Sequence, residues 1–276
     1  MEEDPLVVCL VSPLMRRAHK LPEAKTVAFI DSTGTCDTTN KAITFVLTAS
    51  PAGGIPLGVF LSSGTTANDY ATGLRLLSEI MGDDAFGGQR EPKVFMRDDD
   101  DAEAAGISSV FPNAEQKLCL FHVPQAAWRW LWEGKNRIDL EDRRTLIREL
   151  QSLLRADDKA EAESLYNEIA QSHVARKYAN WQKYLENLWQ RRELWCMAWR
   201  TSVMCGHHTN NLCEATMRIY KDYVMGRIKA HNVVALLKFI GDDLNNYYVD
   251  RLRTFAYSHS QRRQWHLMLE KDIEKT

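Results

Sequence analysis

The stretch 93–122 constrains the fold of this chain more than any other. The apolar run Val94–Met96 leads through Arg97 into four consecutive aspartates, and a short helical pattern follows before a Pro112–Asn113 turn. A second apolar run then ends at His122. This order of strand, acids, helix and strand is typical of an α/β sheet, in which ligands bind and catalytic residues lie at the carboxyl ends of the strands. Carboxylates placed there favour a hard cation such as Mg²⁺ or Mn²⁺.

The four aspartates also permit a simpler interpretation, a solvated acidic loop whose last members cap the following helix. We favour Asp98 as the metal-facing residue because it follows the strand most closely, and Asp99 is the alternative. Asp100 and Asp101 are expected to cap the helix. Matching acids elsewhere in the chain would favour the metal site over the solvated loop.

Three apolar segments before this stretch predict an antiparallel meander. They span 26–30, 43–48 and 57–63, and short turns join them. A helix is expected from about Ala67, and strands at 93–97 and 117–122 bring the total to five. The predicted class is therefore α/β, and the order resembles the mixed five-stranded sheet of ribonuclease H-like domains with helices on its faces. In that architecture the first strand lies beside the fourth, which would bring Asp31 next to Asp98.

The rest of the chain is predicted to be helical. Helices are expected at 141–155, 157–171 and 173–195, with aromatic stripes that are typical of core packing. Thr209 or Asn210 is a suitable N-cap for a late helix that carries Glu214, and a long helix is expected at 231–257. The expected organisation is a lead-in segment at 1–24, the first part of the sheet domain at 25–135, a large all-helical insertion at 136–203, C-terminal helices that complete the core at 204–258, and a charged tail at 259–276.

Composition excludes some classes of partner. No apolar run approaches the roughly 18 residues that span a bilayer, so no membrane partner is expected. The acidic N-terminus does not have the layout of a signal peptide, which predicts an intracellular protein. Six scattered cysteines are expected to be thiols or metal ligands. The formal net charge of −2 gives no overall attraction to nucleic acid, so such binding would need a local basic face.

Three acids stand at positions that suit shared metal ions. Asp31 ends the first strand, Asp98 ends the fourth, and Glu214 lies in the first turns of a helix that follows the helical insertion. Two-metal nucleases and polynucleotidyl transferases hold a pair of ions with such carboxylates. As alternatives, Asp31 caps a turn, and Glu214 is a first-turn acid that interacts with the helix dipole.

Five short segments resemble the catalytic domain of Mutator-like (MULE) transposases, the DDE group of the ribonuclease H-like superfamily. They are the segments 29–33, 96–99, 110–114, 119–122 and 209–214, and the resemblance covers about residues 10–250. It implies Asp31, Asp98 and Glu214 as the catalytic and metal-binding acids, with two Mg²⁺ or Mn²⁺ ions as cofactors. It also implies hydrolysis at transposon ends, strand transfer to target DNA and a nuclear location, and it leaves a homo-oligomer open.

Two departures from the family pattern support a second hypothesis. Arg97 stands where a small hydroxylated residue is usual, and its guanidinium would compete with a metal unless strand alternation turns it to the other face. The flanking DNA-binding and zinc-finger modules of such transposases are absent from this chain. A domesticated, catalytically silent DNA-binding or regulatory protein is therefore the alternative function.

A third hypothesis is an interaction module held together by zinc. Cys119 and His122 have metal-ligand spacing, and Cys205 with His207 or His208 would complete a four-ligand Zn²⁺ site. The alternatives are that Cys119 is a small core residue and that His122 has a role near the acids without zinc.

Candidate contacts with DNA come from the same late segment of the chain. His207 and His208 are candidates for contacting the scissile phosphate. Arg218 and Lys221 follow Glu214 on neighbouring stripes of the predicted helix, where they would meet DNA phosphates or simply form a charged surface.

Overall fold

The computed structural model describes residues 6–34, 36, 38, 40–200, 204, 206–229 and 232–258. Six strands form one mixed sheet in the order β1-β4-β3-β2-β5-β6. Their bounds are β1 (Val7–Leu10), β2 (Val27–Thr33), β3 (Ala42–Thr48), β4 (Ile55–Ser62), β5 (Val94–Arg97) and β6 (Glu115–Leu118). The central strand β2 pairs antiparallel with β3 and parallel with β5, so the predicted neighbourhood of the two acid-bearing strands is confirmed.

The expectation of five strands is wrong, because the predicted lead-in segment contributes a sixth. Strand β1 pairs antiparallel with β4 and forms an edge of the sheet. All four of its residues are only half-buried. A run this short has no clear apolar alternation, so the sequence pattern did not distinguish it from an irregular segment.

The last predicted strand, at 117–122, is also corrected. Strand β6 ends at Leu118, and His122 is the first residue of helix α4 (His122–Trp132). The Leu120 amide donates to the His208 carbonyl at 2.9 Å, and the His122 amide donates to the Cys119 carbonyl at 3.2 Å. These bonds turn the chain out of the sheet after Cys119, although the sequence there remains apolar.

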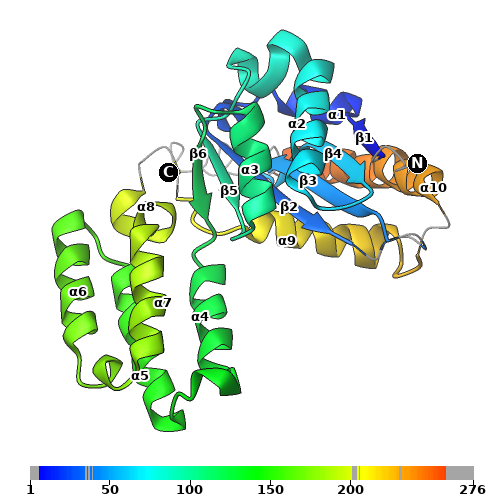
Figure 1. Ribbon diagram of the computed structural model, residues 1–276. Coiled ribbons are helices and arrows are strands. Elements are labelled where there is room, and N and C mark those ends of the chain that lie inside the picture. Colours follow the sequence, from blue (N-terminus) through cyan, green and yellow to red (C-terminus); the bar gives the residue numbers. More distant parts are fainter. Residues whose placement is uncertain are drawn as a thin grey trace, which may run out of the picture.

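Helices cover both faces of the sheet (Figure 1). Their bounds are α1 (Pro13–Ala18), α2 (Ala67–Met81), α3 (Asp101–Val110), α4, α5 (Leu140–Leu154), α6 (Lys159–Gln171), α7 (Ala179–Gln190), α8 (Arg192–Trp195), α9 (Asn211–Arg218) and α10 (Val233–Lys238). Two π-helical segments, η7 (Ile219–Val224) and η8 (Phe239–Leu244), follow α9 and α10, and residues 245–258 are helical. Short 3₁₀ turns are η1 (Pro22–Lys25), η2 (Gly82–Gly88), η3 (Gly134–Asn136), η4 (Ala175–Lys177) and η5 (Met197–Trp199).

Strand alternation divides the core of the sheet domain into two layers. Phe29 of β2 and Met96 of β5 face one side, where Cys213 of α9 and the last helices cover the sheet. Ile30 and Phe95 face the other side, and α2 and α3 pack against them. Figure 1 shows α2 and α3 on one face of the sheet and α9 on the other.

Helix starts are set by local side chains. The Thr66 hydroxyl accepts from the Asp69 amide at the start of α2, and Asp69 bonds back to the Thr66 amide, which makes a capping box. At the start of α3 the Asp100 carboxylate accepts from the Glu103 amide at 2.7 Å. The expectation that Asp100 caps this helix is therefore confirmed.

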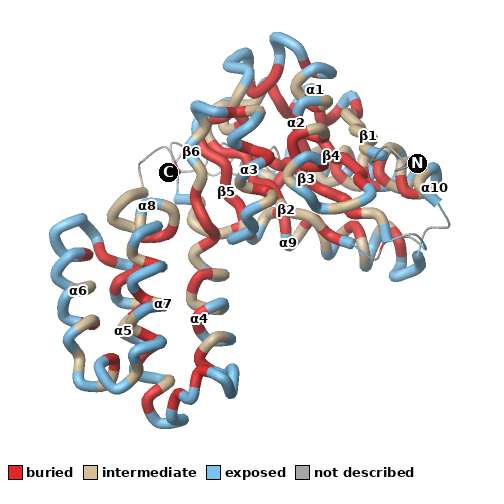
Figure 2. The backbone as a smooth tube through the Cα atoms, in the orientation of Figure 1, coloured by how far each residue is buried: buried red, intermediate tan, exposed pale blue. Residues whose placement is uncertain are grey.

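Helices α5 to α8 lie within the predicted insertion at 136–203, and they share a core with α4, which precedes it (Figures 1 and 2). Trp181 and Trp195 are fully buried there, and α4, α5 and α6 pack in sequence order. The expectation of one helix at 173–195 is wrong, because the chain turns at η4 and breaks again between α7 and α8. The predicted helix at 231–257 is observed from Val233, while residue 231 lies outside the described residues.

The part of the chain that the structure describes contains no helix long and apolar enough to cross a membrane.

Candidate active site

The register of β2 and β5 brings two of the predicted acids together. Phe29 pairs with Met96 in the parallel ladder, and continuing this register by two residues places Asp31 opposite Asp98. Asp31 and Asp98 come two residues after Phe29 and Met96, so strand alternation turns them to the same face of the sheet, the face that α9 covers. The two aspartates therefore lie at adjacent strand ends on the face that carries Glu214.

Helix α9 is held against these strands by Asn210, which is fully buried. Its side-chain amide donates to the Ile30 carbonyl at 3.1 Å, and its backbone amide donates to the Cys119 sulfur at 3.2 Å. Asn210 stands at the N-cap position, but its side chain makes no capping bond. Of the two predicted N-cap residues, Asn210 occupies the position, but its side-chain amide ties the start of α9 to β2 instead of capping the helix.

Glu214 lies in the first turn of α9, and His122 connects it to Asp98. The Nδ1 atom of His122 lies 2.5 Å from Asp98 Oδ1, and its Nε2 atom lies 3.1 Å from Glu214 Oε1. The His122 ring thus lies between two acids that are far apart in the sequence and contacts one with each of its nitrogens.

Asp31 occupies the most desolvated position of the group. Burial, followed by the charge of Asp98, raises the pKa of Asp31 to about 7, and Glu214 acts in the same direction. The Ser32 amide donates to Asp31 Oδ1 at 2.7 Å and His122 lies nearby, and both lower this pKa. The raised pKa therefore reflects first the burial of the Asp31 carboxyl and second its closeness to Asp98.

The remaining aspartates of the acidic run have separate partners. Asp99 makes a bidentate ion pair with Arg191, at 2.7 and 2.9 Å, and so links the acidic loop to the helical insertion. Asp100 caps α3, and Asp101 is exposed in its first turn. Of these four carboxylates, the one that contacts His122 is that of Asp98.

Arg97 points away from the acids. It is buried on the opposite face of the sheet, where its Nε atom donates to Gln116 Oε1 at 2.5 Å. Its Nη1 atom donates to the carbonyls of Asp98 and Asp100, at 2.6 and 3.4 Å. The guanidinium therefore shapes the backbone of the acidic loop rather than competing for the Asp98 carboxylate.

A buried acid lies behind this loop. Glu103 of α3 is 3% exposed, and burial raises its pKa well above the ordinary range, with the charge of Asp31 adding to the effect. Arg97 opposes this rise. The sequence signalled Glu103 only as a first-turn acid of α3, so its proximity to the site was not predicted.

The predicted zinc ligands are only partly described. Cys119 is buried and accepts a hydrogen bond from Asn210, and burial raises the pKa of its thiol. His207 packs edge-on against Phe29, with ring centroids 5.5 Å apart. Cys205 lies outside the described residues. Among the residues that are described, no group of three or more His, Cys, Asp or Glu side chains is already arranged to hold a metal ion.

The predicted DNA contacts lie in different places. Arg218 is exposed in the last turn of α9. Lys221 lines a cavity of about 310 Å³ beside η7, whereas His208 lines a groove beside α4. Burial and nearby Arg200 lower the pKa of His208.

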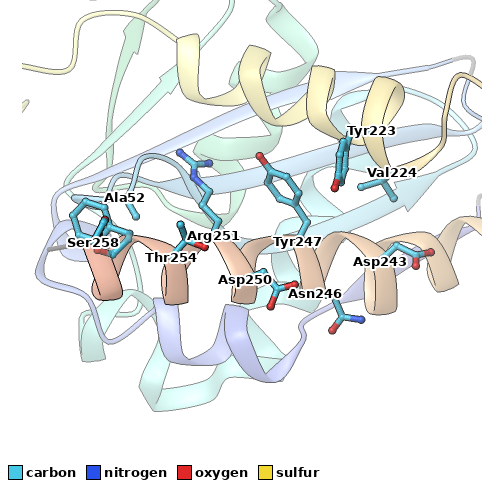
Figure 3. A pocket seen from close by; sticks show the side chains of 11 residues that line it. Ala52, Tyr223, Val224, Asp243, Asn246, Tyr247, Asp250, Arg251, Thr254 and Ser258 are labelled. Carbon is cyan, nitrogen blue, oxygen red and sulfur yellow. Dashed lines mark hydrogen bonds between the residues drawn. The ribbon is translucent and has the colours of Figure 1, made fainter. Parts of the chain in front are cut away.

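A further cavity, of about 770 Å³, lies along the helix at 245–258 (Figure 3). Tyr223 and Tyr247 line it with ring centroids 5.3 Å apart. None of the predicted site residues lines this cavity. It is therefore separate from the acidic site.

The fold and the site together define a mixed α/β protein with an acidic centre at the carboxyl ends of two parallel strands. Residues 27–126 match the family model described as the MULE transposase domain, and this match supports the MULE family. The matched segment includes Asp31, Asp98 and His122, while Glu214 lies beyond it. A comparison with curated proteins found no match.

Proposed function

We propose that this chain is a transposase catalytic domain of the DDE group, with a ribonuclease H-like fold, that cuts DNA and joins the freed 3′-hydroxyl to a target. The observation that supports this most directly is the convergence of Asp31, Asp98 and Glu214. Asp31 lies opposite Asp98 by register, and His122 connects Asp98 to Glu214. Carboxylates from two strand ends and a helix then serve one reaction centre.

The chemistry of these side chains fits divalent cations. The donors are hard carboxylate oxygens, which Mg²⁺ and Mn²⁺ prefer, and the charges of Asp98 and Glu214 both act on Asp31. Asp31, Asp98 and Glu214 would hold the metal. When bound, two ions would activate the attacking water or 3′-hydroxyl and stabilise the leaving oxygen.

The protein's own residues have separate tasks in this proposal. Asp31, at the end of the central strand, would bind the metal through its half-buried carboxylate. His122 holds the side chains of Asp98 and Glu214 toward each other. Arg97 and Asn210 position the acids through backbone bonds on either side of them.

A catalytically silent, DNA-binding derivative is the second candidate. The observation in its favour is that His122 already pairs with two of the acids, and the described residues contain no preformed group of three metal ligands. A histidine that kept this pairing permanently would leave the acids closed to a metal ion.

Cleavage of transposon-end DNA separates the two candidates. Wild-type protein, Asp31→Asn and Glu214→Gln would be incubated with the DNA and Mg²⁺ or Mn²⁺, with exposed Asp243→Asn as the matched control. We expect cleavage by wild type and the control, and a loss of at least about 100-fold in the two site variants. No cleavage by wild type, or equal cleavage by all four proteins, would refute the catalytic proposal.

A further inference from the structure

A groove of about 880 Å³ lies between α4 and α5, beside the loop that enters α9. Its lining includes three arginines and two large aromatic side chains but no aspartate or glutamate. The whole chain has a net charge of −2, so this local excess of positive charge is not a consequence of composition. A groove of this kind is complementary to a polyanion.

The positive charges lie along one side of α5 and at its C-cap, Arg155. Arg144, Arg148 and Arg155 all line the groove and are exposed. Arg144 and Arg148 are one turn apart, and none of the three pairs with an acidic side chain among the described residues. By contrast, Arg143 of the same helix bonds the Ile138 carbonyl, so it has a structural role. The three groove arginines have no such role and remain free to bind phosphates.

The aromatic side chains lie on the facing element. Phe121 and Trp128 line the groove and are 54% and 39% exposed. Large apolar surface left open next to unpaired arginines is unusual unless a ligand covers it. Aromatic faces beside cations are the arrangement that binds unpaired nucleotides, because bases stack on the rings while the arginines contact the backbone.

The groove wall is built from chain segments that continue into the acidic site. Phe121 is adjacent to His122, and His208 and Thr209 of the groove wall come just before Asn210 and α9. The Leu120 amide donates to the His208 carbonyl, so these two wall segments are bonded to each other. The same two segments therefore carry the groove wall and present His122 and Glu214.

We propose that this groove binds an unpaired strand of DNA, with its phosphates on the α5 arginines and a base stacked on Trp128, and leads that strand to Asp31, Asp98 and Glu214. The inference rests on the proposed function for the identity of the nucleic acid. Binding itself needs no metal and no cleavage, so it is measured separately from catalysis.

The test is fluorescence anisotropy in EDTA with a labelled oligothymidylate of about 12 nucleotides and a blunt duplex of equal length, from about 50 to 200 mM salt. The double variant Arg144→Ala/Arg148→Ala is expected to bind oligothymidylate more weakly than the wild type. The slope of log binding constant against log salt concentration should become less steep by about 1.4, or about 0.7 for each lost phosphate contact. Trp128→Ala is expected to weaken oligothymidylate binding about 5- to 150-fold, with Trp128→Phe close to wild type.

The control is Lys20→Ala/Arg75→Ala, which removes the same charge from exposed positions outside the groove. It should keep the wild-type salt slope, and circular dichroism should show that every variant is folded. Equal slopes for wild type and Arg144→Ala/Arg148→Ala, or an equal loss in the control, would overturn the proposal. The proposal would also be overturned if Trp128→Ala lost duplex binding and oligothymidylate binding equally. It would likewise be overturned if the wild type bound polyglutamate as tightly as oligothymidylate, because that result would indicate a site for acidic peptides.

The two proposals fail in different ways. If wild type binds oligothymidylate through the groove but never cuts DNA, the catalytic proposal is wrong and the groove remains. If wild type cuts DNA and the groove variants bind and cut equally well, the groove proposal is wrong and catalysis remains.

Discussion

Asp31→Asn is expected to stabilise the folded protein while abolishing cleavage. The substitution keeps the shape of the side chain and removes a charge that burial and Asp98 disfavour. Because folding raises the pKa of Asp31, the folded state binds more protons than the unfolded state between the two pKa values. The contribution of Asp31 to the free energy of unfolding is therefore most favourable below about pH 4. It falls as the pH rises toward about 7 and does not change further above that.

The magnitude follows from the size of the shift. A rise of about 3 from the ordinary aspartate pKa near 3.9 corresponds to about 4 kcal/mol at pH 8. This is an upper limit, since relaxation of the site and entry of water reduce the penalty, and we expect a gain of about 1–3 kcal/mol in Asp31→Asn. At pH 5 the gain should be about a third of its value at pH 8.

Urea denaturation in EDTA at pH 5 and pH 8, followed by far-UV circular dichroism, measures this difference. Exposed Asp243→Asn is the control and should shift the free energy of unfolding by less than about 0.5 kcal/mol at both pH values. Adding Mg²⁺ at pH 8 should stabilise wild type and not Asp31→Asn, because the ion binds only the intact site. An Asp31→Asn protein less stable than wild type at pH 8, or a gain equal at both pH values, would refute the electrostatic reasoning.

Two further substitutions test how the site is positioned. Asn210→Ala leaves the buried Ile30 carbonyl without its side-chain donor and should lower the free energy of unfolding by about 1–3 kcal/mol. The control, exposed Asn211→Ala, should change it by less than about 0.5 kcal/mol. Equal effects of the two substitutions in urea titrations would argue against the role of Asn210. A double-mutant cycle of Asp99→Asn and Arg191→Gln should give a coupling free energy of at most about 1 kcal/mol, because the ion pair is partly exposed. If the effects of the two substitutions simply add, the ion pair does not hold the insertion to the acidic loop.

The strand order near the site could be predicted because its signals are local. Apolar runs led into Asp31 and Asp98, and the resemblance to ribonuclease H-like domains then placed the two strands side by side, as observed. The cap at Asp100 was predictable for the same reason, since capping depends on residues within one turn. Strand β1 was missed because four half-buried residues have too little periodicity.

The connections across the site could not be predicted, because they depend on tertiary placement. No sequence signal pairs His122 with both Asp98 and Glu214, or directs the Asn210 amide to β2 instead of its own helix. The Asp99–Arg191 pair joins residues in separate elements, and spacing carries no information about it. The direction of Arg97 was deducible in principle from strand alternation, which placed it on the face opposite Asp98.

The helical insertion leaves the sheet near Leu120 and returns at His208, and a backbone hydrogen bond joins these two residues. The two ends of the helical insertion are therefore joined to each other, so its length and internal shape have little effect on where the following helix, α9, begins. During synthesis, however, both aspartates and His122 leave the ribosome long before α9 is made. A nascent or truncated chain that ends before α9 would lack Glu214 and the Asn210 anchor, so the group of three acids would assemble only after α9 has been made.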